Sequence, residues 1–145
     1  MAALLDSSVW IPYLRDRKYA KTVDPLVARG QVVLHTVVLL ELYAGAATLE
    51  DRRDVDVVRA AVERLGLLVH PSAHDLALAG QVLSDYARRH GRIRPRDHSH
   101  DLLIALGAGR GRHVLLTTNV SDMKRWAREL SRRACLVVRV VRPQS

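Results

Sequence analysis

The sequence predicts an α/β fold in which helices flank a parallel sheet of about five strands. Short apolar runs rich in Val and Leu show little apolar–polar alternation, which is typical of strands covered on both faces. Longer amphipathic segments separate these runs, and that alternation of strands and helices predicts a parallel sheet. The chain has 145 residues, 48% of them apolar and 26% charged. We therefore expect one globular domain spanning residues 1–145.

The elements follow one another along the chain in a regular order. Runs of four to six mainly apolar residues, too short for buried helices, predict strands over residues 2–5, 31–35, 67–70, 114–117 and 136–141. Apolar residues at helical spacing predict helices over residues 8–14, 20–28, 37–47, 52–65, 73–90, 97–108 and 122–130. Gly30, Gly66 and Gly91 stand where helices are expected to stop.

The charge balance predicts a polyanionic partner. Lys and Arg outnumber Asp and Glu by 23 to 15, and all but three of the basic residues are arginine. The planar guanidinium group of arginine suits phosphate oxygens. Aromatic residues make up only 4% of the chain and Phe is absent, which argues against a nucleic-acid surface built on base stacking.

The cysteine count and the hydropathy pattern predict a cytoplasmic protein without a membrane segment. Cys135 is the one cysteine, so an internal disulfide and a zinc–thiolate cluster are excluded. The first residues lack the basic segment and the long apolar stretch of a signal peptide. No run approaches the roughly 20 apolar residues that cross a bilayer.

Acidic residues fall where ligands bind in open parallel sheets, just beyond the carboxyl ends of the strands. Asp6 follows the first predicted strand, and either caps the next helix or binds a metal ion. Glu41 lies in an apolar helix, where an unpaired carboxylate is costly unless an arginine or a metal ion compensates it. Asp101 precedes the apolar Ile104 and Ala105 by one turn, in the second turn of a helix that Asp97 is expected to cap.

Two more polar residues follow the fourth predicted strand. Asn119 stands at the strand's end and offers a neutral oxygen, whereas Asp122 begins the next helix as a cap or a partner of the helix dipole. Several oxygen ligands at one sheet edge suit Mg²⁺ or Mn²⁺. Such ions activate water and stabilise the charge that develops on a phosphodiester. Together with the arginine excess, this pattern favours phosphodiester hydrolysis.

Four segments in this order and spacing resemble a PIN-domain ribonuclease, and most closely the VapC toxins: residues 5–10, 41–42, 101–105 and 117–122. The resemblance implies a PIN-like three-layer sandwich and Mg²⁺- or Mn²⁺-dependent RNA endonuclease activity. It also implies a homodimer that acts as the toxin of a type II toxin–antitoxin pair and is inhibited by a cognate VapB-type antitoxin.

The resemblance assigns roles to residues of this chain. The acidic metal-binding and catalytic residues would be Asp6, Glu41 and Asp101. Ser8 would support the first of these through a hydrogen bond. The fourth position of the family is commonly Asp or Asn, which points to Asn119, while Asp122 matches the acid that usually follows a little later. The choice between these two stays open, and we expect one well-occupied ion.

Basic residues and histidines surround the predicted site. A loop rich in arginine precedes the Asp101 helix and either is simply solvated or steers RNA phosphates, through Arg92, Arg94 and Arg96. An acidic tail of an antitoxin fits the same surface. His35 is expected to be a satisfied structural residue, whereas His98 and His100 are expected to face solvent or RNA.

Two other functions compete with a nuclease. A catalytically inactive RNA- or protein-binding module on the same fold would keep the arginine surface without metal-dependent cleavage. A phosphatase of the haloacid dehalogenase type also begins with a strand followed by Asp. That chemistry needs a second Asp two residues later, and Ser8 stands there instead.

Overall fold

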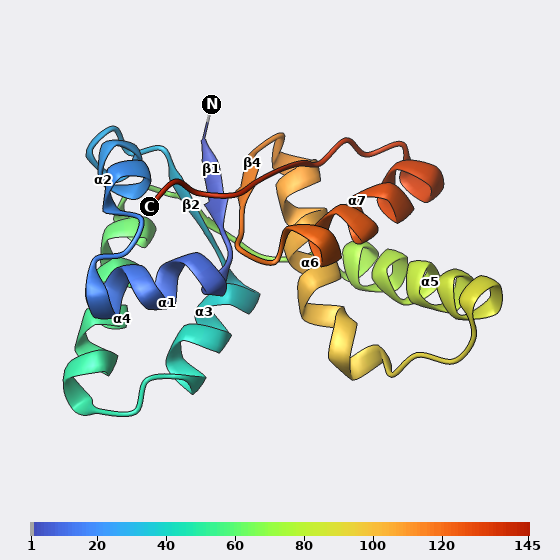
Figure 1. Cartoon of the computed structure of the whole chain (residues 1–145), viewed down its shortest axis with the longest axis horizontal. Coiled ribbons are helices and arrows are strands. Elements are labelled where there is room, and N and C mark those ends of the chain that lie inside the picture. Colours follow the sequence, from blue (N-terminus) through green and yellow to red (C-terminus); the bar gives the residue numbers. More distant parts are fainter. Residues whose placement is uncertain (1) are drawn as a thin grey trace.

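The structure is a computed structural model that describes residues 2–145. It contains a five-stranded parallel sheet, and Figure 1 shows helices on both sides of the central strands. The strands run in the order β3-β2-β1-β4-β5, and every neighbouring pair is parallel. Their bounds are β1 Ala3–Leu5, β2 Val32–His35, β3 Leu68–Val69, β4 Val114–Leu116 and β5 Arg139–Val141. The predicted α/β fold is confirmed, although each strand is shorter than its apolar run.

Seven helices connect and follow the strands within residues 2–145. They are α1 Ser7–Asp16, α2 Ala20–Ala28, α3 Thr36–Ala44, α4 Leu49–Arg64, α5 Ala73–His90, α6 Pro95–Gly111 and α7 Val120–Ala134. In Figure 1, α1 to α4 lie to the left of the strands and α5 to α7 lie to their right. None of the described helices is long and apolar enough to cross a membrane.

Local capping chemistry explains where the helix ends differ from those predicted. Thr48 and Asp51 form a reciprocal capping box, so α4 begins three residues before the predicted start at residue 52. Proline suits the first position of a helix, and α6 accordingly begins at Pro95. The expectation that Asp97 caps this helix is wrong, because Asp97 lies in its first turn and Arg94 holds the capping position.

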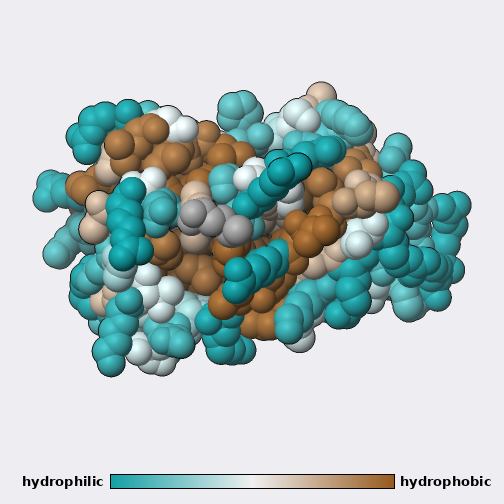
Figure 2. All heavy atoms as spheres, turned by 90° about the horizontal axis from the view of Figure 1, so that it is seen from above, coloured by the Kyte–Doolittle hydropathy of each residue, from teal (hydrophilic) through white to brown (hydrophobic). Residues whose placement is uncertain are grey.

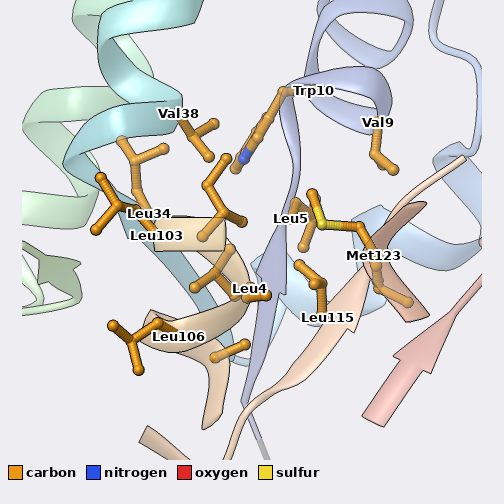
Figure 3. Close-up of a cluster of buried hydrophobic side chains, with 14 of the residues drawn as sticks. Leu4, Leu5, Val9, Trp10, Leu34, Val38, Leu103, Leu106, Leu115 and Met123 are labelled. Atoms are coloured by element: carbon orange, nitrogen blue, oxygen red, sulfur yellow. The ribbon is translucent and has the colours of Figure 1, made fainter. Parts of the chain in front are cut away.

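The core forms on both faces of the central strands. Leu4 and Leu5 are consecutive residues of β1 that point to opposite faces, and both are fully buried. Figure 3 shows Leu4 close to Leu103 and Leu106 of α6, while Leu115 of β4 lies beside β1. Each side chain so buried contributes about 1.5–3 kcal/mol to folding. The central strands are therefore rigid supports for whatever follows their carboxyl ends.

The carboxyl ends of the strands lie at the lower edge of the sheet in Figure 1, where β1 and β2 lead directly into α1 and α3. The amino-terminal half of α6 reaches the same edge from below. The opposite end of the molecule, seen from above in Figure 2, carries hydrophobic patches among polar residues. Asp6, at the carboxyl end of β1, lies at the lower edge of the sheet.

Candidate active site

Asp6 lies between the end of β1 and the start of α1, with 4% of its surface exposed. Its amide donates to the carbonyl of Leu116 in β4 at 2.9 Å, which fixes its backbone against the neighbouring strand. The carboxylate accepts hydrogen bonds from Thr117 Oγ1 at 2.8 Å and from Ser8 Oγ at 3.0 Å. It does so instead of capping α1, although Asp6 holds the capping position. The capping interpretation of this side chain is therefore wrong.

Three hydroxyl groups donate to Asp6, because Ser7 Oγ also donates to its Oδ1 atom, at 3.4 Å. Ser8 Oγ also accepts from the amide of Thr118 at 3.0 Å, so the predicted contact between Ser8 and Asp6 is part of a larger network. Thr117 is fully buried, and its Oγ1 accepts from the amide of Asn119 at 2.9 Å. The network ties the end of β1 to the turn after β4. The sequence reasoning did not identify Thr117, whose only signal was a hydroxyl residue directly after an apolar strand.

Glu41 projects from α3 with 28% of its side chain exposed. Its Oε1 atom is buried and has no hydrogen-bond partner among residues 2–145. Its Oε2 atom lies 3.8 Å from Nδ1 of His100 on α6, so its ion-pair partner is a histidine rather than an arginine. Burial raises the pKa of Glu41, and the negative charge of Asp6 raises it further. Glu41 and Asp6 therefore face a common space.

Asp101 on α6 completes the set of carboxylates. Burial raises its pKa to about 6, and the charges of Asp6, Glu41 and Asp122 add to the shift. Burial is the larger cause of the shift, and the contribution from like charges indicates that these carboxylates lie near one another. In the described part of the chain, however, no three His, Cys, Asp or Glu side chains already stand at metal-ligand spacing. The carboxylates share one edge of the sheet without enclosing a finished site.

Asn119 and Asp122 lie at the start of α7. Asn119 holds the capping position, while Asp122 lies in the first turn, where a negative charge stabilises the helix. Asp122 also pairs with Arg125 one turn further along. The negative charge of Asp122 nevertheless contributes to the raised pKa of Asp101. Both residues remain candidates for the fourth position.

The donor set fits a hard divalent cation. The groups that converge at this edge are carboxylates, which Mg²⁺ and Mn²⁺ prefer. The unpartnered Oε1 of Glu41 is a buried acceptor that a cation would satisfy. A cation would also remove the repulsion that raises the pKa of Asp101.

The histidines take three different roles. His35 ends β2, and its Nδ1 accepts from the amide of Val37 at 3.1 Å, so it caps α3. Its Nε2 is buried without a partner in the described chain, so the expected structural role is only half satisfied. His98 packs its ring on Trp126 with 5.4 Å between centroids, which corrects the expectation that it faces solvent or RNA. His100 is partly exposed and faces Glu41.

The arginine loop, residues 91–96, leads from α5 into the first turn of α6. Its three arginines, Arg92, Arg94 and Arg96, are exposed. None of them forms an ion pair within residues 2–145. By contrast, Arg88 and Arg89 at the end of α5 pair with Asp85 and Glu129. The loop is therefore the part of this basic segment whose charge is free to meet a ligand.

Comparisons with known proteins identify the family and the fold. The profile of the PIN domain matches residues 3–128. DNA-bound VapBC from Salmonella typhimurium is 22% identical with a TM-score of 0.64, over 99% of this chain and 100% of that chain. VapBC2 from Rickettsia felis, bound to a promoter fragment, is 19% identical with a TM-score of 0.65, over 97% and 99% of the two chains.

VapBC-1 from nontypeable Haemophilus influenzae is 20% identical with a TM-score of 0.64, over 98% of each chain. A search of curated proteins gave no match. The likeness to the solved structures establishes the fold, and the family profile covers most of the sequence, including every carboxylate of the candidate site. The chain belongs to the PIN domain family.

Proposed function

We propose that the protein is a VapC-type toxin, an RNA endonuclease that depends on Mg²⁺ or Mn²⁺ and belongs to a type II toxin–antitoxin pair. PIN domains are generally nucleases, which supports an enzymatic role. The observation that carries the proposal is the convergence of Asp6, Glu41 and Asp101 at one sheet edge, with Asp6 buried and the Oε1 atom of Glu41 left without a partner among residues 2–145. Burial first, and the charges of the neighbouring carboxylates second, raise the pKa of Asp101 there. Negative charges placed this close together destabilise the folded protein. A bound divalent cation neutralises them, and the free energy that this releases strengthens the binding of the ion.

The residues at this edge take different roles in metal binding and in positioning. Asp6 and Asp101 hold the ion, and Glu41 contributes directly or through water. Bound there, a divalent ion acidifies a water molecule and offsets the charge that develops on the phosphodiester. Ser8 and Thr117 fix the rotamer of Asp6 through hydrogen bonds of 3.0 and 2.8 Å. Asn119 or Asp122 supplies the fourth polar group at the edge.

The substrate and the partner follow from charge and from the solved relatives. The free arginines of the loop, Arg92, Arg94 and Arg96, place positive charge beside the Asp101 helix, where RNA phosphates approach. Solved structures of similar fold include VapBC complexes, and by analogy a VapB-type antitoxin holds this chain inactive. We further propose that the protein is a homodimer in the cytoplasm.

A cleavage assay tests the nuclease. The purified chain is incubated with end-labelled single-stranded RNA or DNA, in Mg²⁺, in Mn²⁺ or in EDTA. We expect cuts in RNA with either metal and none in EDTA. Asp101→Asn and Glu41→Gln remove metal-binding oxygens, so each should lower the rate by at least about a hundredfold. Asp97→Asn, on the exposed first turn of the same helix, is the matched control and should cleave normally.

The main alternative is a catalytically inactive module that binds RNA or protein on the same fold. It is favoured by one observation, the absence of three side chains at ligand spacing within residues 2–145. RNA binding without cleavage in any metal supports this alternative and refutes the nuclease. Full activity of Asp101→Asn also refutes the proposed site.

A further inference from the structure

His100 lies beside the candidate metal site on the same helix as Asp101. Its Nδ1 atom is 3.8 Å from Oε2 of Glu41, which projects from α3. Both side chains are partly open to solvent, with 46% and 28% of their surfaces exposed. The gap is too long for a hydrogen bond. The Nδ1 atom of His100 and the Oε2 atom of Glu41 therefore lie near each other without a direct hydrogen bond, and both side chains are open to solvent.

The spacing suits two ligands of one ion. Metal–nitrogen and metal–oxygen bonds to His and carboxylate ligands are about 2.0–2.2 Å long. Two donors on one ion are thus at most about 4.3 Å apart, and less when the angle between their bonds is smaller. The separation of 3.8 Å between Glu41 and His100 falls within this limit. The pair is therefore within reach of one ion, and adjacent ligands of a six-coordinate ion with such bonds lie closer together, at about 3 Å.

His98 differs from His100 in a way that supports this assignment. Residues two apart on a helix point in different directions and do not chelate together. His98 packs its ring against Trp126 in the core, whereas His100 is turned toward Glu41. The second oxygen of Glu41, Oε1, is buried and lacks a protein partner in the described chain. The packing of α6 therefore directs His100 toward Glu41 at the carboxylate edge, whereas His98 packs against the buried ring of Trp126.

We infer that His100 supplies a nitrogen ligand next to Glu41, so that the site prefers Mn²⁺ and later first-row ions to Mg²⁺. This inference rests on the metal site of the proposed function. Mg²⁺ favours oxygen ligands and keeps its water shell, whereas affinity for nitrogen rises from Mn²⁺ toward Zn²⁺. A site with carboxylates and one imidazole should therefore show a larger difference in affinity between Mn²⁺ and Mg²⁺ than a site built of carboxylates alone.

Pulsed electron paramagnetic resonance of bound Mn²⁺ tests the inference directly. The full chain is prepared without a histidine tag and loaded with Mn²⁺. We expect modulation from a coordinated imidazole nitrogen in the unaltered chain. His100→Gln should abolish that modulation while the carboxylates still bind Mn²⁺. His74→Gln, at an exposed histidine of α5, is the matched control and should keep it. Circular dichroism confirms that each variant is folded.

Calorimetry supplies the second readout. The ratio of Mn²⁺ to Mg²⁺ affinity should fall about tenfold in His100→Gln and stay unchanged in His74→Gln. Bound Mn²⁺ without nitrogen modulation in the unaltered chain overturns the role of His100, as does modulation that persists in His100→Gln. RNA cleavage by the unaltered chain decides the proposed function separately. Cleavage without a nitrogen signal refutes His100 alone, whereas failure to bind either ion refutes both.

Discussion

Acidification should destabilise this protein through one buried histidine. His35 has 1% of its surface exposed, and burial lowers its pKa to about 4. Asp75 raises this pKa and His70 lowers it, each by less than burial does. In the unfolded chain the pKa of a histidine is about 6.5. Between these values the unfolded chain binds a proton that the folded chain excludes.

The size and sign of the effect follow from linkage. The shift of about 2.5 pKa units corresponds to roughly 3 kcal/mol. Because the folded pKa is the lower one, the unfolded state binds more protons as the pH falls, and stability falls with it. The full contribution of neutral His35 is present above about pH 6.5 and is lost by about pH 4. At pH 4.5 the loss amounts to about 2.5 kcal/mol.

His35→Asn separates this effect from other titrations. Asparagine is a good capping residue and can accept from the amide of Val37, as Nδ1 of His35 does. The variant loses ring volume, so it should be less stable at pH 7.5, but its stability should depend less on pH. Asp101 and His113 titrate in both proteins, so their contributions cancel in the comparison.

Urea denaturation at pH 7.5, 6.5, 5.5 and 4.5 measures the free energy of unfolding of both proteins. The unaltered chain should lose about 2.5 kcal/mol more than the variant between the first pH and the last. Parallel curves for the two proteins would refute the reasoning, because they would mean that His35 is protonated equally well in the folded state.

Three further predictions concern packing, the site and the loop. Gly107→Ala places a Cβ 2.6 Å from the ring of His35, so it should cost about 1–3 kcal/mol in urea denaturation, whereas Gly80→Ala, with open space around its Cβ, should not destabilise. Thr117→Val removes the hydroxyl that fixes Asp6 and should slow RNA cleavage about tenfold with RNA affinity unchanged; unaltered cleavage contradicts the positioning role. Replacing the three loop arginines by Gln should weaken RNA binding, measured by fluorescence anisotropy. The slope of log affinity against log salt should become shallower by about 2, because each lost phosphate contact on single-stranded RNA accounts for about 0.7. The substituted loop residues are Arg92, Arg94 and Arg96. Two exposed arginines of α4, Arg52 and Arg53, serve as the control, and an equal loss of RNA affinity on replacing them contradicts the role of the loop.

The fold could be predicted because its signals are local. Val- and Leu-rich runs such as the one at β2 specify strands buried on both faces, and helical periodicity specifies what lies between them. The helix ends were harder to predict, because the bonds between Thr48 and Asp51 override a pattern based on hydrophobicity. Strand lengths were overestimated because apolar residues continue beyond the paired ladder, as at Leu136 and Val137 before β5.

Only those residues of the site that directly follow a strand, or that lie within an apolar helix, could be predicted from the sequence. Asp6 and Asp101 stood out in the sequence because their positions are unusual for a carboxylate. The contacts of Thr117 with Asp6 and of His100 with Glu41 depend on how β4 lies against β1 and α6 against α3. Neither contact leaves a periodic trace in the sequence, so both required the three-dimensional structure.

Crystals soaked in Mn²⁺ offer the most direct test of a shared divalent ion. Anomalous scattering measured near the manganese edge locates the ion without reference to activity. A peak about 2.2 Å from carboxylate oxygens of both Asp6 and Asp101 is the predicted result. Manganese bound only elsewhere on the protein, with those two carboxylates left without an ion between them, would contradict the account.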